Sequence, residues 1–226
     1  DVSLLKKFKV ACDPANGMGS LYVAKLFERV GGELIKMNFE LDGTFPAHQA
    51  DPLDFNNLVP LQDKVKEVGA DFGIEPDGDG DRVFFIDEKG QVVPATYISA
   101  LIAQEVLKDH PGETIVVDIR YTRNVMDSVR KNGGKSFISK VGHAFITEDV
   151  NREGAYFAGE SSGHFYFRET GGAESAVRVI IYILKALSTT GKTLSELLSA
   201  LVSSHESGER NFILPDGTDT KALMEQ

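Results

Sequence analysis

Residues 70–86 have the sequence ADFGIEPDGDGDRVFFI, in which two apolar runs flank a loop of alternating aspartates and glycines. Short runs rich in Phe, Ile and Val favour buried strands, and we expect one strand over 70–74 and another over 83–86. Outward from this pair, strand-like runs such as 9–12 and 114–118 alternate with stretches of helical periodicity. This alternation is typical of an α/β fold built on largely parallel sheets.

Apolar residues at helical spacing predict the segments that connect the strands. The expected helices lie near residues 23–30, 58–68, 98–106, 122–132, 144–152, 174–188 and 194–203. The pattern predicts two similar α/β domains, 1–91 and 92–204, each a mostly parallel or mixed sheet sandwiched by helices. Residues 205–226 are polar with one strand-like run at 211–214, and we expect them to begin a third, truncated domain.

The composition is that of an ordinary globular protein with an acidic surplus. The 226 residues include 34 Asp+Glu and 24 Lys+Arg, which gives a formal charge of −10. This charge argues against nonspecific binding to nucleic acid or to an anionic membrane surface. Cys12 is the single cysteine, so a disulfide scaffold within the chain is excluded. No apolar run approaches the ~18 residues of a membrane span, and we expect a cytoplasmic protein without a secretory signal.

The loop between the first two strands has the features of a metal site. Asp77, Asp79 and Asp81 are separated by glycines, which allow the backbone to curl so that the carboxylates converge. Converging anions need a cation, and an all-oxygen ligand set selects Mg²⁺, Mn²⁺ or Ca²⁺. A solvated acidic turn is the simpler alternative. An EF-hand is not favoured, because Arg82 occupies the position of the required glycine and the flanking segments are strands.

A second loop, residues 159–164, has the sequence GESSGH between two aromatic strands. Glu160, Ser162 and His164 alternate, so in an extended loop their side chains point the same way. A carboxylate beside a hydroxyl is suited to the paired hydroxyls of a sugar. A plain Gly/Ser turn is the alternative interpretation.

Basic side chains follow the strands of the second predicted domain. Arg120 comes after the strand at 114–118, and His143 begins the helix at 144–152, so both lie at carboxyl ends of strands, where open α/β sheets bind ligands. His143 can carry a proton or contact a phosphate, although a lone histidine is more often structural. The turn at 13–17 lacks both the dinucleotide-binding glycine pattern and the P-loop lysine, and we assign it a structural role.

Taken in order, these motifs resemble the α-D-phosphohexomutase family, in particular its phosphomannomutase/phosphoglucomutase branch. The resemblance covers nearly the whole chain and runs through Asp13–Gly17, Phe45–His48 with Asp51-Pro52, Asp77–Arg82, Lys140–His143 and Gly159–His164. It implies four domains around a central cleft, of which this chain contains the second and third and the start of the fourth. The first domain of the family carries a phosphoserine and the fourth a phosphate-binding loop.

The implied activity is that of an isomerase and intramolecular phosphotransferase of carbohydrate metabolism. It moves a phosphoryl group between O1 and O6 of a hexose, such as mannose or glucose 1- or 6-phosphate, through a bisphosphorylated sugar and an enzyme phosphoserine. The resemblance implies Mg²⁺ on the three aspartates and a transferring group stabilised by Arg82. The family's loop that carries the phosphoserine is absent from these residues, so the resemblance implies a phosphoprotein whose phosphoserine lies outside this chain. We therefore expect the isolated chain to be inactive.

The remaining roles also follow from the resemblance. Glu160 and Ser162 hold the middle hydroxyls of the sugar and His164 supports their loop, whereas Arg120 and His143 lie near the transferring phosphate. A non-catalytic sugar-phosphate-binding module is the alternative function. A phosphatase of the haloacid-dehalogenase type is disfavoured, because its aspartate nucleophile has no counterpart after the first strand. After the sugar loop, residues 171–174 read GGAE where many family members have an Asp-Gly pair.

Overall fold

A computed structural model describes residues 5–205 and 213–224, which contain two five-stranded sheets. The first unit contains β1 (Lys9–Cys12), α1 (Gly19–Val30), β2 (Glu33–Lys36), α2 (Phe55–Val68), β3 (Phe72–Pro76), β4 (Val83–Asp87) and β5 (Val92–Val93). The second unit contains α3 (Ala95–Asp109), β6 (Thr114–Asp118), α4 (Arg123–Lys131), β7 (Lys135–Ser139), α5 (His143–Arg152), β8 (Phe157–Gly159), β9 (Phe165–Phe167), the 3₁₀ helix η2 (Arg168–Thr170), β10 (Ala173–Glu174), α6 (Ala176–Thr190) and α7 (Leu194–Ser199). A short helix, α8 (Thr220–Met224), follows.

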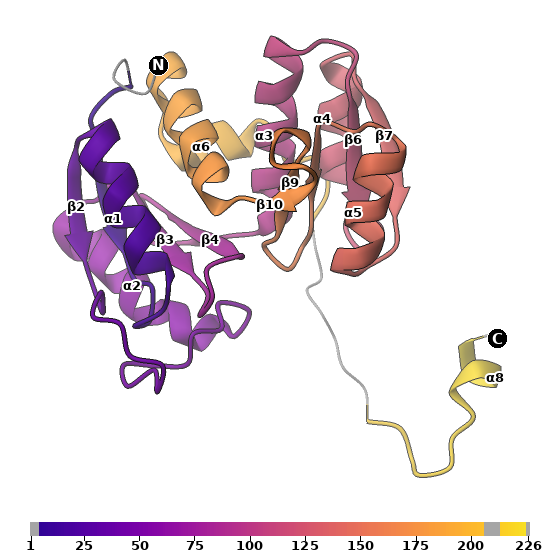
Figure 1. The fold of residues 1–226 in the computed structure, drawn as a ribbon, viewed down its shortest axis with the longest axis horizontal. Helices are drawn as coiled ribbons and strands as arrows, with labels where there is room; N and C mark the ends of the chain where they lie inside the picture. The colour runs from indigo at the N-terminus through magenta and orange to yellow at the C-terminus, as the bar shows by residue number, and fades with distance from the viewer. Residues whose placement is uncertain (1–4, 206–212, 225–226) are drawn as a thin grey trace.

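The two sheets have the same connectivity. The strand order is β2-β1-β3-β4-β5 in the first sheet and β10-β9-β8-β6-β7 in the second. In each, the first strand in the chain pairs in parallel with the next two, and two antiparallel strands then complete the sheet. The expectation of two similar α/β units with mixed sheets is therefore confirmed, and Figure 1 shows them side by side.

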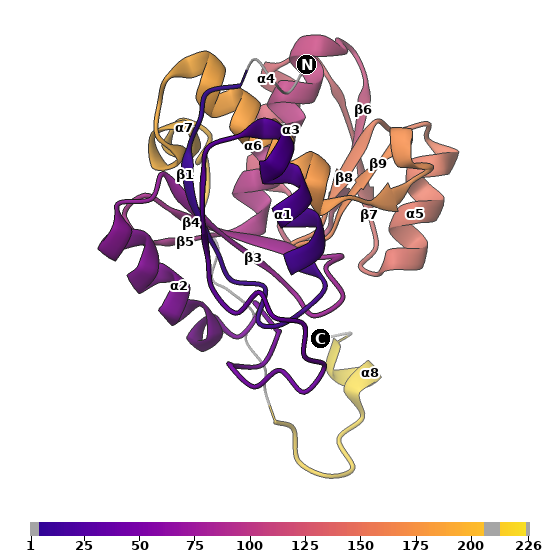
Figure 2. The ribbon, with the colours of Figure 1, turned by 60° about the vertical axis from the view of Figure 1, so that its left-hand side comes forward.

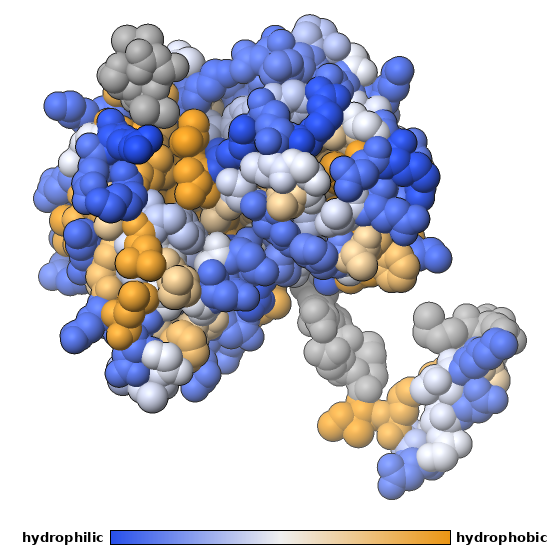
Figure 3. All heavy atoms as spheres, in the orientation of Figure 1, coloured by the Kyte–Doolittle hydropathy of each residue, from blue (hydrophilic) through white to orange (hydrophobic). Residues whose placement is uncertain are grey.

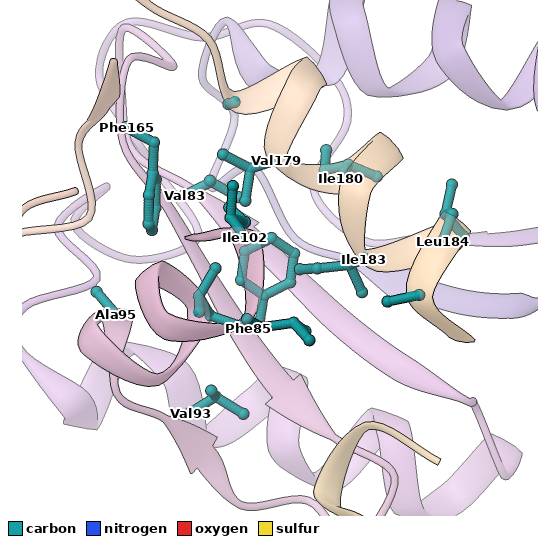
Figure 4. Packing of buried hydrophobic residues seen from close by; sticks show 14 of the residues in the cluster. Val83, Phe85, Val93, Ala95, Ile102, Phe165, Val179, Ile180, Ile183 and Leu184 are labelled. Carbon is teal, nitrogen blue, oxygen red and sulfur yellow. The ribbon is translucent and has the colours of Figure 1, made fainter. Parts of the chain in front are cut away.

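One continuous apolar core joins the two units. Phe85 of β4 packs in the same cluster as Ile102 of α3 and Ile183 of α6 (Figure 4). α3 is buried on nearly every face and contacts α4, α6, α7 and β8. Because α3 and α6 contribute side chains to the core of both sheets, they fix how the carboxyl ends of the strands in one unit face those in the other.

The outer face of each sheet has its own smaller core. Alternate strand residues point to opposite faces, so Val10 enters the shared core while Ala11 packs under α2 with Leu58 and Leu61. Val116 packs in the same way under α5. Figure 2 shows α1 and α2 on opposite sides of the first sheet. Each sheet is therefore covered by helices on both faces, as predicted.

Several expected elements differ in the structure, and three of the differences lie toward the end of the chain. The helix expected at 174–188 begins at Ala176, because residues 173–174 pair with β9 as a strand and Ser175 caps the helix. The helix expected at 194–203 ends at Ser199. Of the strand expected at 211–214, the first two residues lie outside the described part, and the other two form no strand.

Hydrophilic side chains cover most of the face shown in Figure 3, and apolar ones gather in small areas over the first unit. Among the described residues, no helix is both long enough and apolar enough to cross a membrane.

Candidate functional site

The loop between β3 and β4 brings its three aspartates together. One carboxylate oxygen from each of Asp77, Asp79 and Asp81 lies within 4.8 Å of the others. Gly80 turns the chain with a φ of 82°, a left-handed conformation that favours glycine. Asp77 is buried, Asp81 half-buried and Asp79 exposed, so the cluster opens to solvent on one side. The convergence that the spacing predicts is present.

The turn after β1 packs directly against the backbone of this loop. The backbone N–H of Met18 donates to the carbonyl oxygen of Gly78 at 3.0 Å. A Cβ atom on Gly17 would lie 2.7 Å from that same oxygen, so only glycine allows the two backbones to approach so closely. The structural role assigned to residues 13–17 therefore consists of holding the aspartate loop.

Arg82 lies directly beside the three carboxylates. Its Nε donates to Asp77 Oδ2 at 2.7 Å, and its Nη1 donates to Asp51 Oδ1 at 3.2 Å. Burial disfavours the charge, but the hydrogen bond and charge of Asp77, followed by those of Asp51, raise the pKa of Arg82. Asp51 comes from the long loop before α2, which the sequence analysis connects with this site only by resemblance.

The electrostatics and donor set of the aspartate cluster suit a hard divalent cation. Burial, followed by the negative charge of Asp77, raises the pKa of Asp81. The interaction with His164 lowers this pKa and so partly offsets the rise. Such repulsion is relieved when a cation lies among the oxygens. The exposed side of the cluster leaves room for ligands from outside the chain, as Mg²⁺ requires. The residues present therefore fit a divalent metal.

The loop between β8 and β9 is a tight turn rather than the extended segment expected from its alternating pattern. Glu160 N donates to His164 O at 2.9 Å, and Gly163 N donates to Glu160 O at 3.2 Å. The three predicted side chains still converge, because the turn folds back on itself. Ser162 Oγ lies 3.0 Å from His164 Nδ1, and Glu160 Oε2 lies 3.4 Å from the same nitrogen.

Glu160 is a buried carboxylate with only 3% of its surface exposed. Tyr166 donates its hydroxyl to Glu160 Oε2 at 2.8 Å, and Arg120 Nη2 lies 3.4 Å from Oε1. A buried carboxylate needs such partners, because an unpaired charge away from water is costly. Burial, followed by the charge of Glu160, raises the pKa of Tyr166, so this hydroxyl keeps its proton and acts as a donor.

Asp118, at the carboxyl end of β6, organises the basic side of the site. It accepts from Arg120 Nη2 at 2.6 Å and from both the backbone N and the Oγ of Ser161 at 3.0 Å. Burial opposes the charge of Asp118, but the hydrogen bonds from Arg120 and Ser161 lower its pKa. Asp118 was not predicted as a site residue, although its place at a strand end was a usable signal.

The two loops meet directly across the boundary between the units. Val83 N donates to Gly163 O at 3.1 Å, and Arg82 and His164 form an isolated antiparallel bridge. The Nε2 atom of His164 lies 3.5 Å from Asp81 Oδ1. The aspartate loop and the carboxylate-hydroxyl loop therefore belong to one site.

His143 joins this site through a residue that the sequence analysis did not select. It begins α5, and its Nδ1 contacts Glu174 Oε1. A carboxylate oxygen of Glu174 also lies within 4.8 Å of ligand atoms of Asp81 and His164. All nine predicted site residues thus lie in one region, joined by contacts or by ligand atoms within 4.8 Å of one another, and Asp51, Asp118, Tyr166 and Glu174 are additions from the structure.

A cavity of about 540 Å³ lies elsewhere, between α4 and β7, where Arg123, Asp127 and Arg130 are among its lining residues. It is lined by none of the nine predicted site residues, which lie at the junction of the two units.

Comparison with known proteins matches both units. The profile "Phosphoglucomutase/phosphomannomutase, alpha/beta/alpha domain II" matches residues 1–90, and the corresponding profile for domain III matches residues 94–205. A phosphomannomutase of Methanocaldococcus jannaschii is 38% identical over 96% of this chain and 48% of its own length. A phosphomannomutase/phosphoglucomutase of Pseudomonas putida is 36% identical over 96% of this chain and 47% of its own length.

The solved structures agree with the sequence relatives. The crystal structure of a phosphoglucomutase/phosphomannomutase family protein from Burkholderia thailandensis aligns with a TM-score of 0.84 and 32% identity, over 90% of this chain and 46% of the other. The chain therefore spans about half the length of the relatives that it matches.

Proposed function

This chain belongs to the phosphoglucomutase/phosphomannomutase family, and from that premise we propose that it is the central part of a phosphohexomutase. The proposed reaction moves a phosphoryl group reversibly between O1 and O6 of a hexose such as mannose or glucose phosphate. We further propose that residues 1–91 and 92–204 are its second and third domains, and that 205–226 begin the fourth. The observation that carries the proposal is the contact between the two loops, in which His164 Nε2 lies 3.5 Å from Asp81 Oδ1.

The aspartate cluster is the proposed Mg²⁺ site. Asp77, Asp79 and Asp81 would hold the ion, and Mg²⁺ bound there would neutralise charge on a phosphoryl oxygen. Asp77 already accepts hydrogen bonds from the backbone N–H groups of Gly80 and Arg82, which keep the loop curled. These bonds pre-organise the carboxylates, so little ordering remains when a ligand binds.

Arg82 and Arg120 supply permanent positive charge on the two sides of the site. A guanidinium offers a planar fork of donors that matches phosphate oxygens. Each of these side chains is fixed by a buried aspartate, Asp77 for Arg82 and Asp118 for Arg120. Fixed cations favour a transition state with spread negative charge because they need no reorganisation during the reaction.

Glu160 and Ser162 are the proposed sugar contacts. Glu160 accepts from Tyr166 through one oxygen, and its lone pairs offer further acceptor sites for the hydroxyls of a hexose. Ser162 can both donate and accept. His164 and His143 are the proposed carriers of a proton to or from the reacting oxygen, because an imidazole nitrogen can accept or donate a proton.

A mutase assay of the longer protein that contains this chain tests the proposal. We expect it to interconvert the 1- and 6-phosphates of mannose or glucose, and we expect Glu160→Gln to lower kcat/KM by about a hundredfold or more, within the range for a lost charge-assisted contact. The isolated chain serves as the inactive control. A longer protein that binds hexose phosphates without turnover would instead support a non-catalytic binding module.

A further inference from the structure

Glu174 and His143 form an asymmetric pair at the junction of β10 and α5. The Nδ1 atom of His143 contacts Glu174 Oε1. The carboxylate is largely buried, with 11% of its side chain exposed, whereas 61% of the imidazole is exposed. The Nδ1 edge of the ring therefore contacts a largely buried carboxylate, and most of the ring is exposed and accessible to a ligand.

Glu174 is held rigidly on both sides. β10 pairs with β9 in antiparallel register, which places Glu174 opposite Tyr166. The next residue, Ser175, donates its backbone N–H to Phe165 O at 3.0 Å, and its hydroxyl caps α6. The strand pairing and the helix cap fix the backbone that carries the Glu174 carboxylate, so this group can serve as a fixed acceptor for the imidazole of His143.

His143 needs such a partner because of where it lies. It is the first residue of α5, and the exposed N–H groups of a helix N-terminus disfavour a positive charge on a nearby side chain. An ionised carboxylate accepts but does not donate hydrogen bonds, so the contact requires a proton on Nδ1. The opposite nitrogen, Nε2, then carries the lone pair in the neutral ring.

The other imidazole of the site has a similar support. His164 Nδ1 lies 3.4 Å from Glu160 Oε2. The ring of Tyr166 lies near both histidines, with centroid distances of 5.7 Å to His143 and 6.3 Å to His164. Each imidazole thus has a glutamate beside its Nδ1, buried in the case of Glu160 and largely buried in the case of Glu174, and the ring of Tyr166 lies near both imidazoles.

We infer that Glu174 is a positioning residue that fixes the orientation of His143 and keeps its proton on Nδ1, so that Nε2 faces the reacting phosphate. This inference rests on the proposed function for its catalytic meaning. In this role Glu174 acts through the histidine.

The tautomer of His143 tests the inference in the 226-residue chain itself. The chain has five histidines, so long-range ¹H–¹⁵N spectra of the rings are simple, and His143→Gln assigns the signal. In the neutral ring we expect the Nδ1–H tautomer in the parent chain and in Glu174→Gln, whose amide oxygen still accepts. We expect Glu174→Ala to shift the ring toward Nε2–H. Glu169→Ala, which removes an exposed partner of Arg178, is the matched control.

Kinetics of the longer protein test the catalytic part. Glu174→Ala should lower kcat by about tenfold or more, in the lower part of the range for general acid–base groups, and leave KM nearly unchanged. Glu174→Gln should recover part of the loss. An unchanged tautomer in Glu174→Ala, or a kcat equal to that of the parent, would overturn the inference. If the longer protein shows no turnover, the proposed function fails, while the tautomer spectra still decide whether Glu174 positions His143.

Discussion

The backbone N–H of Val83 donates to the carbonyl oxygen of Gly163, 3.1 Å away. This bond joins the end of the aspartate loop to the loop between β8 and β9, which contains the proposed sugar contacts. The two residues are far apart in sequence: Val83 begins β4 of the first sheet, and Gly163 lies in the loop between β8 and β9 of the second unit. Their contact places the proposed metal ligands beside the proposed hydroxyl-binding groups, so the position of one loop depends on that of the other.

Replacing Gly163 by alanine should separate the two loops. Gly163 has a φ of 91°, and a Cβ atom there would lie 2.5 Å from Cε2 of Phe84. Strain of this kind costs about 1–3 kcal/mol. We expect urea denaturation to show a loss of this size in Gly163→Ala. Gly112→Ala is the control, because Gly112 has a φ of 82° but no atom within 4 Å of the added Cβ. Equal losses in both variants would mean that the clash with Phe84 is unimportant.

Asp79 should contribute to cation binding without contributing to the fold. It is exposed, and it shares the carboxylate cluster with Asp77 and Asp81. A unit charge about 4 Å from a cation is worth roughly 1–4 kcal/mol, so Asp79→Asn should weaken Mn²⁺ or Mg²⁺ binding by about tenfold or more. Isothermal titration calorimetry measures the change. Asp63→Asn, which removes an exposed partner of Lys66, should bind the metal like the parent, and equal affinity in Asp79→Asn would count against the site.

Glu75 should make the protein less stable as the pH rises. Burial, followed by the charge of Asp13, raises the pKa of Glu75 from 4.5 to about 9. Between these values the native state retains a proton that the unfolded chain has released. The free energy of unfolding therefore falls with rising pH across this window, by at most about 1.4 kcal/mol per pH unit.

Glu75→Gln removes this titration and keeps the shape of the side chain. We expect the free energy of unfolding of the variant, measured in urea with a chelator present, to fall less than that of the parent between about pH 6 and about pH 8. Glu67→Gln, on the exposed face of α2, should follow the parent. Parallel curves for the parent and Glu75→Gln would show that Glu75 is already ionised in the native state.

Local signals in the sequence were sufficient for most of the fold. The strand over 114–118 and the helix near 58–68 follow from apolar periodicity. β10 was missed because a two-residue strand has no periodicity, and its pairing with Tyr166 is decided by tertiary contacts. For the same reason the sequence placed Glu174 in the following helix.

The candidate site was likewise predictable only in part from the sequence. The convergence of the aspartates could be predicted because glycines separate carboxylates within one short loop. The partners of the basic groups could not be predicted. Asp51 contacts Arg82 from the loop before α2, and Glu174 of β10 contacts His143 at the start of α5. The side chains of Glu160, Ser162 and His164 converge, but the backbone is not the extended one expected, because Gly163 permits a tight turn that the alternating pattern does not indicate.

Paramagnetic relaxation by Mn²⁺ tests most directly whether one cation site adjoins the sugar loop. Relaxation falls steeply with distance, and His164 Nε2 lies 3.5 Å from Asp81 Oδ1, whereas His110 contacts Tyr156 at the other end of β8. At low Mn²⁺ the ring signals of His164 should broaden first and those of His110 last, and Asp79→Asn should weaken the effect. Equal broadening of all the histidines, or an unaffected His164 when Mn²⁺ is bound, would contradict the account.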